Sequence, residues 1–375
     1  MNAATHQPWR DLPAGPAVEA LQVSTYVVPT DAPESDGTLE WDRTTLVLVE
    51  LSAGDARGIG YTYADAATAE VVRAHLSAVV VGQDVFATAA IYARMVQTIR
   101  NLGRPGIVSM AISAVDAALW DAKARLLGVP LFRLLGEARP QVAVYGSGGF
   151  TSYGPARLTE QLGGWAAEGL RFVKMKVGRQ PGDDPTRVRT ARQAIGPGTE
   201  LFVDANGAYD RKQALALAER FAAEDVRWFE EPVSSDDLEG LRLLRDRGPA
   251  GMAIAAGEYG YDPFYFRRML EADAVDVLQA DASRCGGVTG FLLAHALCEA
   301  RGMALSAHCA PALHMHLGCA LNRICHLEYF HDHQRIERML FDGAVVPRGG
   351  ALAPDSSRPG LGLEFKHQDA RRFAV

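Results

Sequence analysis

The sequence predicts an α/β protein whose larger part is a (β/α)8 TIM barrel, preceded by an α+β unit. Short apolar runs alternate with helix-length segments between residues 142 and 328, a pattern typical of repeating βα units and a parallel sheet. A polar group ends almost every run, where (β/α)8 barrels carry their catalytic residues. The length of 375 residues also favours two units over one. These observations together indicate an enzyme.

The N-terminal third differs in pattern from the rest of the chain. Residues 1–17 are expected to form an irregular arm without a secretory signal, because residues 1–12 contain no apolar segment. Residues 18–135 form the predicted α+β unit, in which Asp, Glu, Pro and Gly make 29–42 an expected irregular linker. Its predicted strands are 18–28, 45–51 and 58–63, and its predicted helices are 68–81, 86–100 and 108–127.

The barrel is predicted over residues 140–329. Its expected strands are 142–145, 172–176, 201–204, 228–230, 253–258, 275–281, 304–308 and 326–328. Its expected helices are 155–168, 185–194, 211–224, 238–247, 263–271, 287–300 and 313–322. Residues 330–375 are rich in Pro and Gly and weakly periodic, so we expect this tail to pack back on the N-terminal unit.

Composition excludes several classes of protein. A net charge of −7 without a basic cluster argues against a nucleic-acid partner. No apolar run is long enough to span a membrane. The five cysteines are an odd number and include no Cys-x-x-Cys pair, which favours a reduced, cytoplasmic protein with structural thiols.

Three carboxylates end three consecutive predicted strands: Asp204, Glu230 and Glu258. Because neighbouring strands lie about 5 Å apart, the three should converge and repel one another unless a cation joins them. Ligation by oxygen alone favours Mg2+ over zinc. Any one of them alone could be a solvated acid, but three in succession favour a metal site. Glu231 is the alternative ligand to Glu230, and Glu230 is the predicted one.

Lys174 and Lys176 are two residues apart on a predicted strand, so both side chains should point into the barrel mouth. Two neighbouring ammonium groups lower each other's pKa, which would make one of them a base near neutral pH. The alternative is a surface strand, against which the apolar residues Phe172, Val173 and Met175 argue.

Asp281 and His308 end the next two predicted strands. A hydrogen bond between them would fix the imidazole tautomer and supply a second acid/base group. His314 and His316 fall in the following helix and are interpreted as structural.

Further residues are expected around this centre. Asn206 follows a predicted metal ligand and should contact the substrate or a lysine, and Glu328 should face the metal across the pocket. Loops that cover a site carry its specificity, so we expect Trp41, Tyr61 and Tyr63 to form the wall of a substrate pocket.

Together these motifs resemble the enolase superfamily, mandelate racemase subgroup. The motifs are Lys-x-Lys, Asp-Ala-Asn-Gly, Glu-Glu-Pro, Gly-Glu, Gln-x-Asp followed by Gly-Gly-Val-Thr-Gly, and Ser-x-His. The resemblance covers nearly the whole chain. It implies a modified (β/α)7β or (β/α)8 barrel and an N-terminal capping domain that the C-terminal tail completes.

The resemblance also implies a mechanism with one Mg2+ per active site, held by Asp204, Glu230 and Glu258. Lys176 would remove the proton α to a substrate carboxylate with the help of Lys174, giving an enediolate that the metal and a hydrogen bond from Glu328 stabilise. His308, oriented by Asp281, would act from the opposite face.

The outcome of that reaction stays open between related chemistries. Dehydration of an aldonic or aldaric acid to a 2-keto-3-deoxy acid ranks first, and the alternatives are a 2-hydroxy-acid racemase or epimerase and an aldarolactone cycloisomerase. The position of Asp281 lacks the lysine that muconate-lactonising and dipeptide-epimerase types need. An idle barrel and a zinc hydrolase are minor alternatives, since no member of the constellation is missing and no His-x-His ends the first barrel strand. The implied partners are an acid-sugar substrate and further copies of the chain, as a dimer or octamer.

Overall fold

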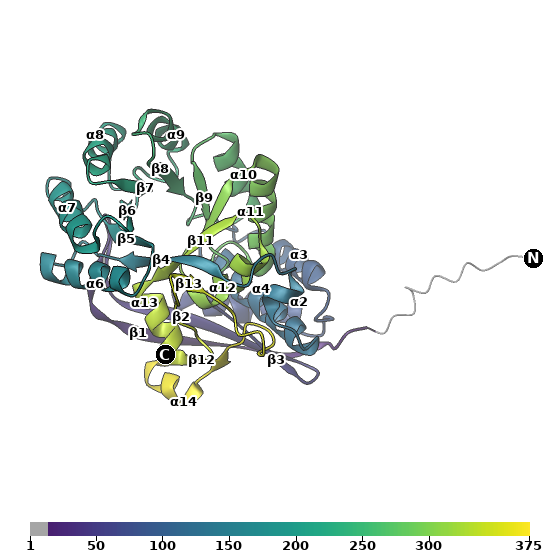
Figure 1. Cartoon of the computed structure of the whole chain (residues 1–375). Coiled ribbons are helices and arrows are strands. Elements are labelled where there is room, and N and C mark those ends of the chain that lie inside the picture. The colour runs from purple at the N-terminus through teal and green to yellow at the C-terminus, as the bar shows by residue number, and fades with distance from the viewer. Residues whose placement is uncertain (1–13) are drawn as a thin grey trace, which may run out of the picture.

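Eight parallel strands close into a barrel in the computed structural model, which describes residues 14–375 (Figure 1). The strands are β4 (Val142–Gly148), β5 (Phe172–Lys176), β6 (Glu200–Asp204), β7 (Val226–Glu230), β8 (Ala253–Ala256), β9 (Val277–Ala280), β10 (Ala304–Ala307) and β11 (Ile324–Phe330). Parallel pairing of β11 with β4 closes the ring. The following helices are α6 (Pro155–Ala167), α7 (Asp184–Ile195), α8 (Arg211–Ala222), α9 (Leu238–Arg247), α10 (Pro263–Glu271), α11 (Gly287–Arg301), α12 (Pro311–Ala320) and α13 (His331–Leu340). The predicted α/β barrel is confirmed.

Side chains alternate in direction along each barrel strand, so neighbouring residues face either the surrounding core or the site inside the barrel. On β5, Val173 and Met175 are buried in the large core cluster that includes residues of the surrounding helices, whereas Lys174 and Lys176 point into the barrel. Below the two lysines an aromatic layer fills the barrel interior, consisting of Tyr145, Phe202 and Trp228 with Ala255. The charged groups therefore lie directly above a buried aromatic layer.

The N-terminal unit is a three-stranded antiparallel sheet covered by helices. Its elements are β1 (Val18–Ser35), β2 (Glu40–Ala53), β3 (Ala56–Tyr63), α1 (Ala67–Val71), a π-helical turn (Val72–Leu76), α2 (Ser77–Val80), α3 (Thr88–Thr98), α4 (Ile107–Leu126) and α5 (Leu131–Leu134). Helix α4 packs against β3 so closely that a Cβ on Gly58 would lie 2.2 Å from the carbonyl oxygen of Ala118. Glycine at that position is what permits the contact.

The expectation of an irregular linker over residues 29–42 is wrong. Strand β1 continues to Ser35 and pairs with β2, with a bulge between Pro29 and Glu34. The turn is closed by Asp36, whose Oδ1 accepts hydrogen bonds from the backbone of Thr38 and Leu39, each 2.6 Å long. Pro29 is tolerated because it lies beside the bulge, where the regular pattern of hydrogen bonds between the strands is interrupted and its missing N–H is not needed.

The C-terminal segment packs on the N-terminal unit, and Figure 1 shows it in yellow beside the purple strands. It contains β12 (Phe341–Asp342), β13 (Ala351–Leu352), β14 (Glu364–Phe365), α14 (His367–Ala370) and a 3-10 turn (Arg371–Phe373). The backbone N–H of Leu361 donates to Asp121 Oδ1 over 2.6 Å, and the ring of Phe365 lies 5.0 Å from that of Tyr26.

Most of the predicted arm, residues 1–17, lies outside the described residues. In the part that is described, the backbone of Gly15 donates to Asp84 Oδ2 over 2.9 Å. Between residues 14 and 375, no helix has the length and apolar character needed to cross a membrane. All five cysteines are free thiols.

Candidate active site

Asp204, Glu230 and Glu258 meet at the carboxyl ends of β6, β7 and β8. One carboxylate oxygen from each lies within 4.8 Å of the others, and all three side chains are buried. The indole N–H of Trp228 donates to Glu230 Oε2 over 2.9 Å, so the aromatic floor orients this carboxylate. Glu231 also lies here, but it stands outside this triad, with a left-handed backbone φ of 40°.

The two lysines of β5 lie among these carboxylates. Lys174 Nζ contacts Glu230, lies 2.9 Å from Glu328 Oε1 and lies 3.3 Å from Asp204 Oδ2. Lys176 Nζ donates to Asp204 Oδ2 over 2.5 Å. Lys174 is fully buried, and Lys176 reaches the cavity above.

The carboxylates control the charge state of both lysines. Burial disfavours the Lys174 ammonium, but Glu230 and Glu328 outweigh burial and raise its pKa well above its usual value. Burial and the repulsion from Lys174 lower the pKa of Lys176, but Asp204, Glu258 and Glu230 together outweigh them and raise it. The two ammonium groups were expected to lower each other's pKa. Within the chain alone, the attraction of the carboxylates outweighs that effect.

Asp281 and His308 form a hydrogen-bonded pair at the ends of β9 and β10. His308 Nδ1 lies 2.8 Å from Asp281 Oδ2, while Asp281 Oδ1 accepts from the backbone and hydroxyl of Ser283. His308 Nε2 lies 3.2 Å from Glu258 Oε2. Burial disfavours the imidazolium, but Cys309 and Glu258 outweigh it, so the pKa of His308 is raised. The imidazole is thus held in one orientation with Nε2 toward the carboxylates.

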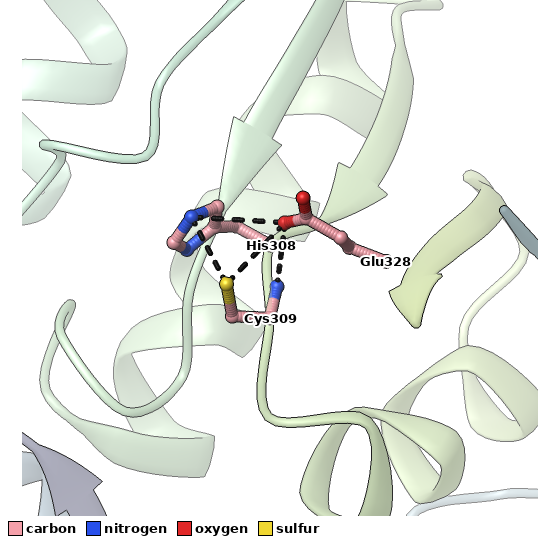
Figure 2. Close-up of side chains that lie close together, drawn as sticks. All are labelled: His308, Cys309 and Glu328. Atoms are coloured by element: carbon pink, nitrogen blue, oxygen red, sulfur yellow. Dashed lines mark hydrogen bonds and ion pairs between the residues drawn. The ribbon is translucent and has the colours of Figure 1, made fainter. Parts of the chain in front are cut away.

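Glu328 on β11 lies between the lysines and His308. Its Oε1 accepts a hydrogen bond of 2.5 Å from the Ser147 hydroxyl, and its Oε2 accepts the backbone N–H of Cys309 over 3.0 Å. The Cys309 thiol lies 3.2 Å from His308 Nε2 and 3.4 Å from Glu328 Oε2 (Figure 2). Burial raises the pKa of Glu328, but Lys174, His308 and Lys176 together outweigh burial and lower it below its usual value.

A cavity of about 520 Å3 opens above these groups, between the barrel mouth and the N-terminal unit. The barrel residues that line it include Lys176, Asn206, Glu258, Arg284, His308 and Cys309. The N-terminal unit contributes Asp36, Leu39, Trp41, Arg43, Thr44, Thr45, Tyr63, Ala64 and Asp65. The hairpin of β1 and β2 thus forms part of the wall.

The structure brings most of the predicted site residues together. Asn206 lines the cavity, and its buried Oδ1 accepts no hydrogen bond from residues 14–375. Trp41 and Tyr63 are wall residues. Tyr61 lies elsewhere, fully buried with its hydroxyl donating to Glu337 Oε1 over 2.7 Å, because it sits deeper along β3 beneath α13. His316 Nε2 donates a hydrogen bond to the Leu361 carbonyl oxygen of the tail, 3.0 Å away.

Sequence reasoning missed Arg284, Cys309 and Ser147. Arg284 Nη1 donates to the backbone oxygen of Glu258 over 3.2 Å and lies 3.4 Å from Glu258 Oε1. Arg284 and Cys309 follow the strand ends within loops, where no periodic pattern marks them. The position of Cys309 directly after the predicted acid/base histidine was the one available signal.

The carboxylate triad fits a divalent metal ion. Burial and Asp204 raise the pKa of Glu230 to about 8, so the carboxylates resist simultaneous ionisation without an added cation. Glu258 Oε2 accepts no hydrogen bond from the described residues. Three oxygen ligands and no thiolate or imidazole within the triad match the preference of Mg2+.

A capped (β/α)8 barrel with an all-carboxylate triad and flanking acid/base residues is the arrangement of the enolase superfamily. Residues 157–370 match the family model described as enolase C-terminal domain-like. Residues 20–136 match the model of the mandelate racemase / muconate lactonizing enzyme N-terminal domain. The chain therefore belongs to the mandelate racemase subgroup of the enolase superfamily.

Individual relatives cover nearly the whole chain. It is 33% identical to the 3,6-anhydro-alpha-L-galactonate cycloisomerase of Streptomyces coelicolor, over 96% of this chain and 99% of the relative. A mandelate racemase/muconate lactonizing enzyme-like protein from Rubrobacter xylanophilus is 57% identical, with a TM-score of 0.94 over 96% of this chain and 100% of that structure. An L-talarate dehydratase from Polaromonas, solved with Mg and L-glucarate, is 29% identical, with a TM-score of 0.86 over 96% of this chain and 97% of that structure.

Proposed function

We propose that this chain abstracts the proton α to the carboxylate of an acid sugar and that the product is a 2-keto-3-deoxy acid. One observation carries the proposal: Lys176 and His308 line the same cavity beside the carboxylate triad. In the closed sheet, β5 and β10 are separated by β6 to β9 in one direction and by β4 and β11 in the other. The two acid/base groups therefore approach a substrate from different sides.

Asp204, Glu230 and Glu258 would hold one Mg2+. When bound, it supplies fixed positive charge that offsets the carboxylates around Lys176 and stabilises the negative charge developing on the substrate carboxylate. The solved Polaromonas dehydratase contains Mg together with an acid sugar, which supports this assignment.

The chain's own residues divide the proton transfers. Lys176 removes the α-proton at Nζ, and Lys174, buried beneath it, keeps positive charge next to Glu230 and Glu328. His308, held by Asp281, delivers a proton from Nε2 to the leaving β-hydroxyl. Glu328 can donate a hydrogen bond to the intermediate only in its protonated form, whereas Lys174 and His308 favour the carboxylate by lowering its pKa. The burial of these groups excludes water from the reaction.

Substrate selection is assigned to the cavity wall. Asn206 offers an amide to a substrate oxygen, and Trp41 and Tyr63 limit the space on the side of the N-terminal unit. Arg284 adds a cation beside Glu258. A polar wall of this kind suits a polyhydroxylated acid better than an aromatic one.

A cycloisomerisation is the second candidate. The observation that favours it is the 33% identity to a 3,6-anhydro-alpha-L-galactonate cycloisomerase across almost all of both chains. The same lysine could remove an α-proton there, and His308 would then protonate a ring oxygen or carbon in place of a leaving hydroxyl.

The test is a screen of the full chain with Mg2+ against a library of aldonic and aldaric acids and their lactones. Formation of a 2-keto acid, read by semicarbazide absorbance, supports dehydration and identifies the substrate. If no 2-keto acid forms, exchange of the α-proton in D2O supports racemisation or cycloisomerisation instead. Absence of both product and exchange across the library would contradict acid-sugar chemistry.

A further inference from the structure

A second group of metal-ligating atoms lies beside the carboxylate triad. His308 Nε2, Cys309 Sγ and a carboxylate oxygen of Glu328 all lie within 4.8 Å of one another, and the three side chains are buried (Figure 2). His308 and Cys309 line the cavity, so an ion that enters the cavity reaches them. This group differs from the triad because it offers one nitrogen, one sulfur and one oxygen.

The separations match those around a tetrahedral zinc ion. Zn–S and Zn–N bonds of about 2.3 and 2.0 Å place neighbouring ligand atoms about 3.3–3.6 Å apart. Here Nε2 lies 3.2 Å from Sγ, Sγ lies 3.4 Å from Glu328 Oε2, and Nε2 lies 3.7 Å from the same oxygen. Only small side-chain shifts separate this arrangement from a coordination sphere.

The backbone around Cys309 fixes the thiol in this place. Cys309 and Ala310 both have left-handed backbones, with φ of 53° and 37°, which non-glycine residues seldom adopt. The Cys309 N–H is held by Glu328 and the Ala310 N–H donates to His333 Nδ1 over 3.3 Å. The thiol therefore faces His308 and Glu328.

A further buried oxygen points at the same group. Glu258 Oε2 lies 3.2 Å from His308 Nε2, and it accepts no hydrogen bond from residues 14–375. Glu258 also belongs to the carboxylate triad. The two clusters thus adjoin at Glu258, and it could complete a four-ligand sphere around the second one.

We propose that His308, Cys309 and Glu328 form a thiophilic metal site for a divalent ion such as Zn2+, and that its occupation stops turnover by engaging His308 Nε2. Imidazole and thiolate favour such ions, whereas the oxygen triad favours Mg2+, so the two clusters select different metals. The effect on turnover rests on the proposed function, but the binding of the metal does not.

The test uses the full chain in excess Mg2+, with Co2+ as the probe. One equivalent of Co2+ should produce a thiolate-to-cobalt charge-transfer absorption, and Zn2+ should displace it. Cys309→Ser should lose this absorption, whereas Cys325→Ser, which removes the exposed cysteine, should keep it. No absorption in the wild-type chain, or its persistence in Cys309→Ser, would overturn the site.

Two further measurements separate the parts of the proposal. X-ray absorption of the zinc-loaded wild-type chain should show one sulfur among the ligands, and this needs no variant that must fold; a sphere without sulfur overturns the site. On a substrate found in the screen, Zn2+ should inhibit the wild type at least tenfold more strongly than Cys309→Ser. Cobalt binding without such inhibition would overturn the inhibitory role alone, and the cobalt signal is informative even if no acid sugar is turned over.

Discussion

The environment of Lys176 decides how this residue can act. Its ammonium donates to Asp204 Oδ2, and the nearby carboxylates raise its pKa above the usual value. A lysine must be in its neutral amine form to accept a proton, so Lys176 needs added positive charge near Asp204 before it can work as a base at neutral pH. The lysine pair alone does not provide that charge, and reasoning from two isolated ammonium groups left out the carboxylates that raise both pKa values.

Replacement of Lys176 by Ala should abolish proton abstraction. Loss of a general base typically lowers a rate by about 10²–10⁴-fold, and we expect exchange of the substrate α-proton with D2O to fall by at least about 100-fold. NMR measures the exchange, and calorimetry should show that Mg2+ still binds. Lys212→Ala, on the exposed face of α8, is the matched control. Undiminished exchange in Lys176→Ala would show that another residue is the base.

Replacement of His308 by Asn should separate the two halves of the reaction. The α-proton should still exchange because Lys176 is intact, while product formation falls by about 10²–10⁴-fold because the leaving group is not protonated. Parallel NMR and 2-keto acid assays on one sample measure both. The exposed His367→Asn variant should behave as wild type in both assays. Full product formation by His308→Asn would remove His308 from the mechanism.

Strand-end residues were predictable because parallel strands end at one rim. The sequence therefore indicated that Asp204, Glu230 and Glu258 would meet, and their atoms do lie within 4.8 Å of one another. The placement of Tyr61 was not predictable, since alternation puts Tyr61 and Tyr63 on one face of β3 without saying how far the cavity extends. Contacts of Arg284 depend on a loop path that no periodicity encodes.

At the scale of elements, the hairpin of β1 and β2 covers the site. Trp41 packs its ring 5.6 Å from that of Phe150, and its indole N–H donates to Glu34 Oε2 over 2.9 Å. The residues that suggested an irregular linker, Pro29 and the acidic positions near it, instead form a bulge and a turn. Pairing with β2 makes the end of β1 a strand, which the composition of this segment did not indicate.

The Gly-Gly-Val-Thr-Gly motif is explained by the docking of α4 on the barrel. Gly287 has a φ of 77°, and a Cβ there would lie 2.3 Å from Asp116 Oδ2. Asp116 accepts hydrogen bonds from the backbone and hydroxyl of Thr289, over 2.9 and 2.7 Å. The motif thus joins two units of the chain, and the sequence alone gave it no structural role.

Glu337 on α13 joins the same two units and should make stability depend on pH. It accepts hydrogen bonds from Tyr61 and from the backbone of Ala312, and burial raises its pKa from 4.5 to about 8. An acid whose pKa is higher in the folded state contributes stability below its unfolded pKa and loses it as pH rises through the folded value. The loss therefore falls between about pH 4.5 and 8 and is on the order of 5 kcal/mol, at about 1.4 kcal/mol per pKa unit.

Glu337→Gln isolates this contribution because the amide keeps an acceptor for Tyr61 and does not ionise. Urea unfolding at pH 5 and at pH 9 should show the wild type losing free energy of unfolding relative to the variant at the higher pH. Glu271→Gln, an exposed substitution on α10, should show no such change relative to wild type. An equal difference between Glu337→Gln and wild type at both pH values would contradict the assignment.

For the whole molecule, the barrel concentrates carboxylates where the N-terminal unit closes over them. Asp204, Glu230, Glu231, Glu258 and Glu328 are all nearly inaccessible to solvent, and burial with mutual repulsion raises the pKa of Glu230 and Glu231. Keeping all five carboxylates ionised without an added cation would oppose folding. The architecture therefore links the stability of the fold to a cation in the site.

Mg2+ should raise the free energy of unfolding of the whole chain. A ligand that binds only the folded state contributes about 2.7 kcal/mol at 100 times its Kd, so the thermal midpoint should rise with Mg2+ and fall in EDTA. EDTA should also stop turnover, and added Mg2+ should restore it.

Asp204→Asn relieves repulsion and could itself stabilise the metal-free chain. The quantity to compare is therefore the Mg2+-dependent increase in the free energy of unfolding, measured by calorimetry. That increment should vanish in Asp204→Asn and persist in the exposed variant Glu271→Gln. If the thermal midpoint of the wild type does not change with Mg2+, or if activity remains in EDTA, the triad does not bind the metal.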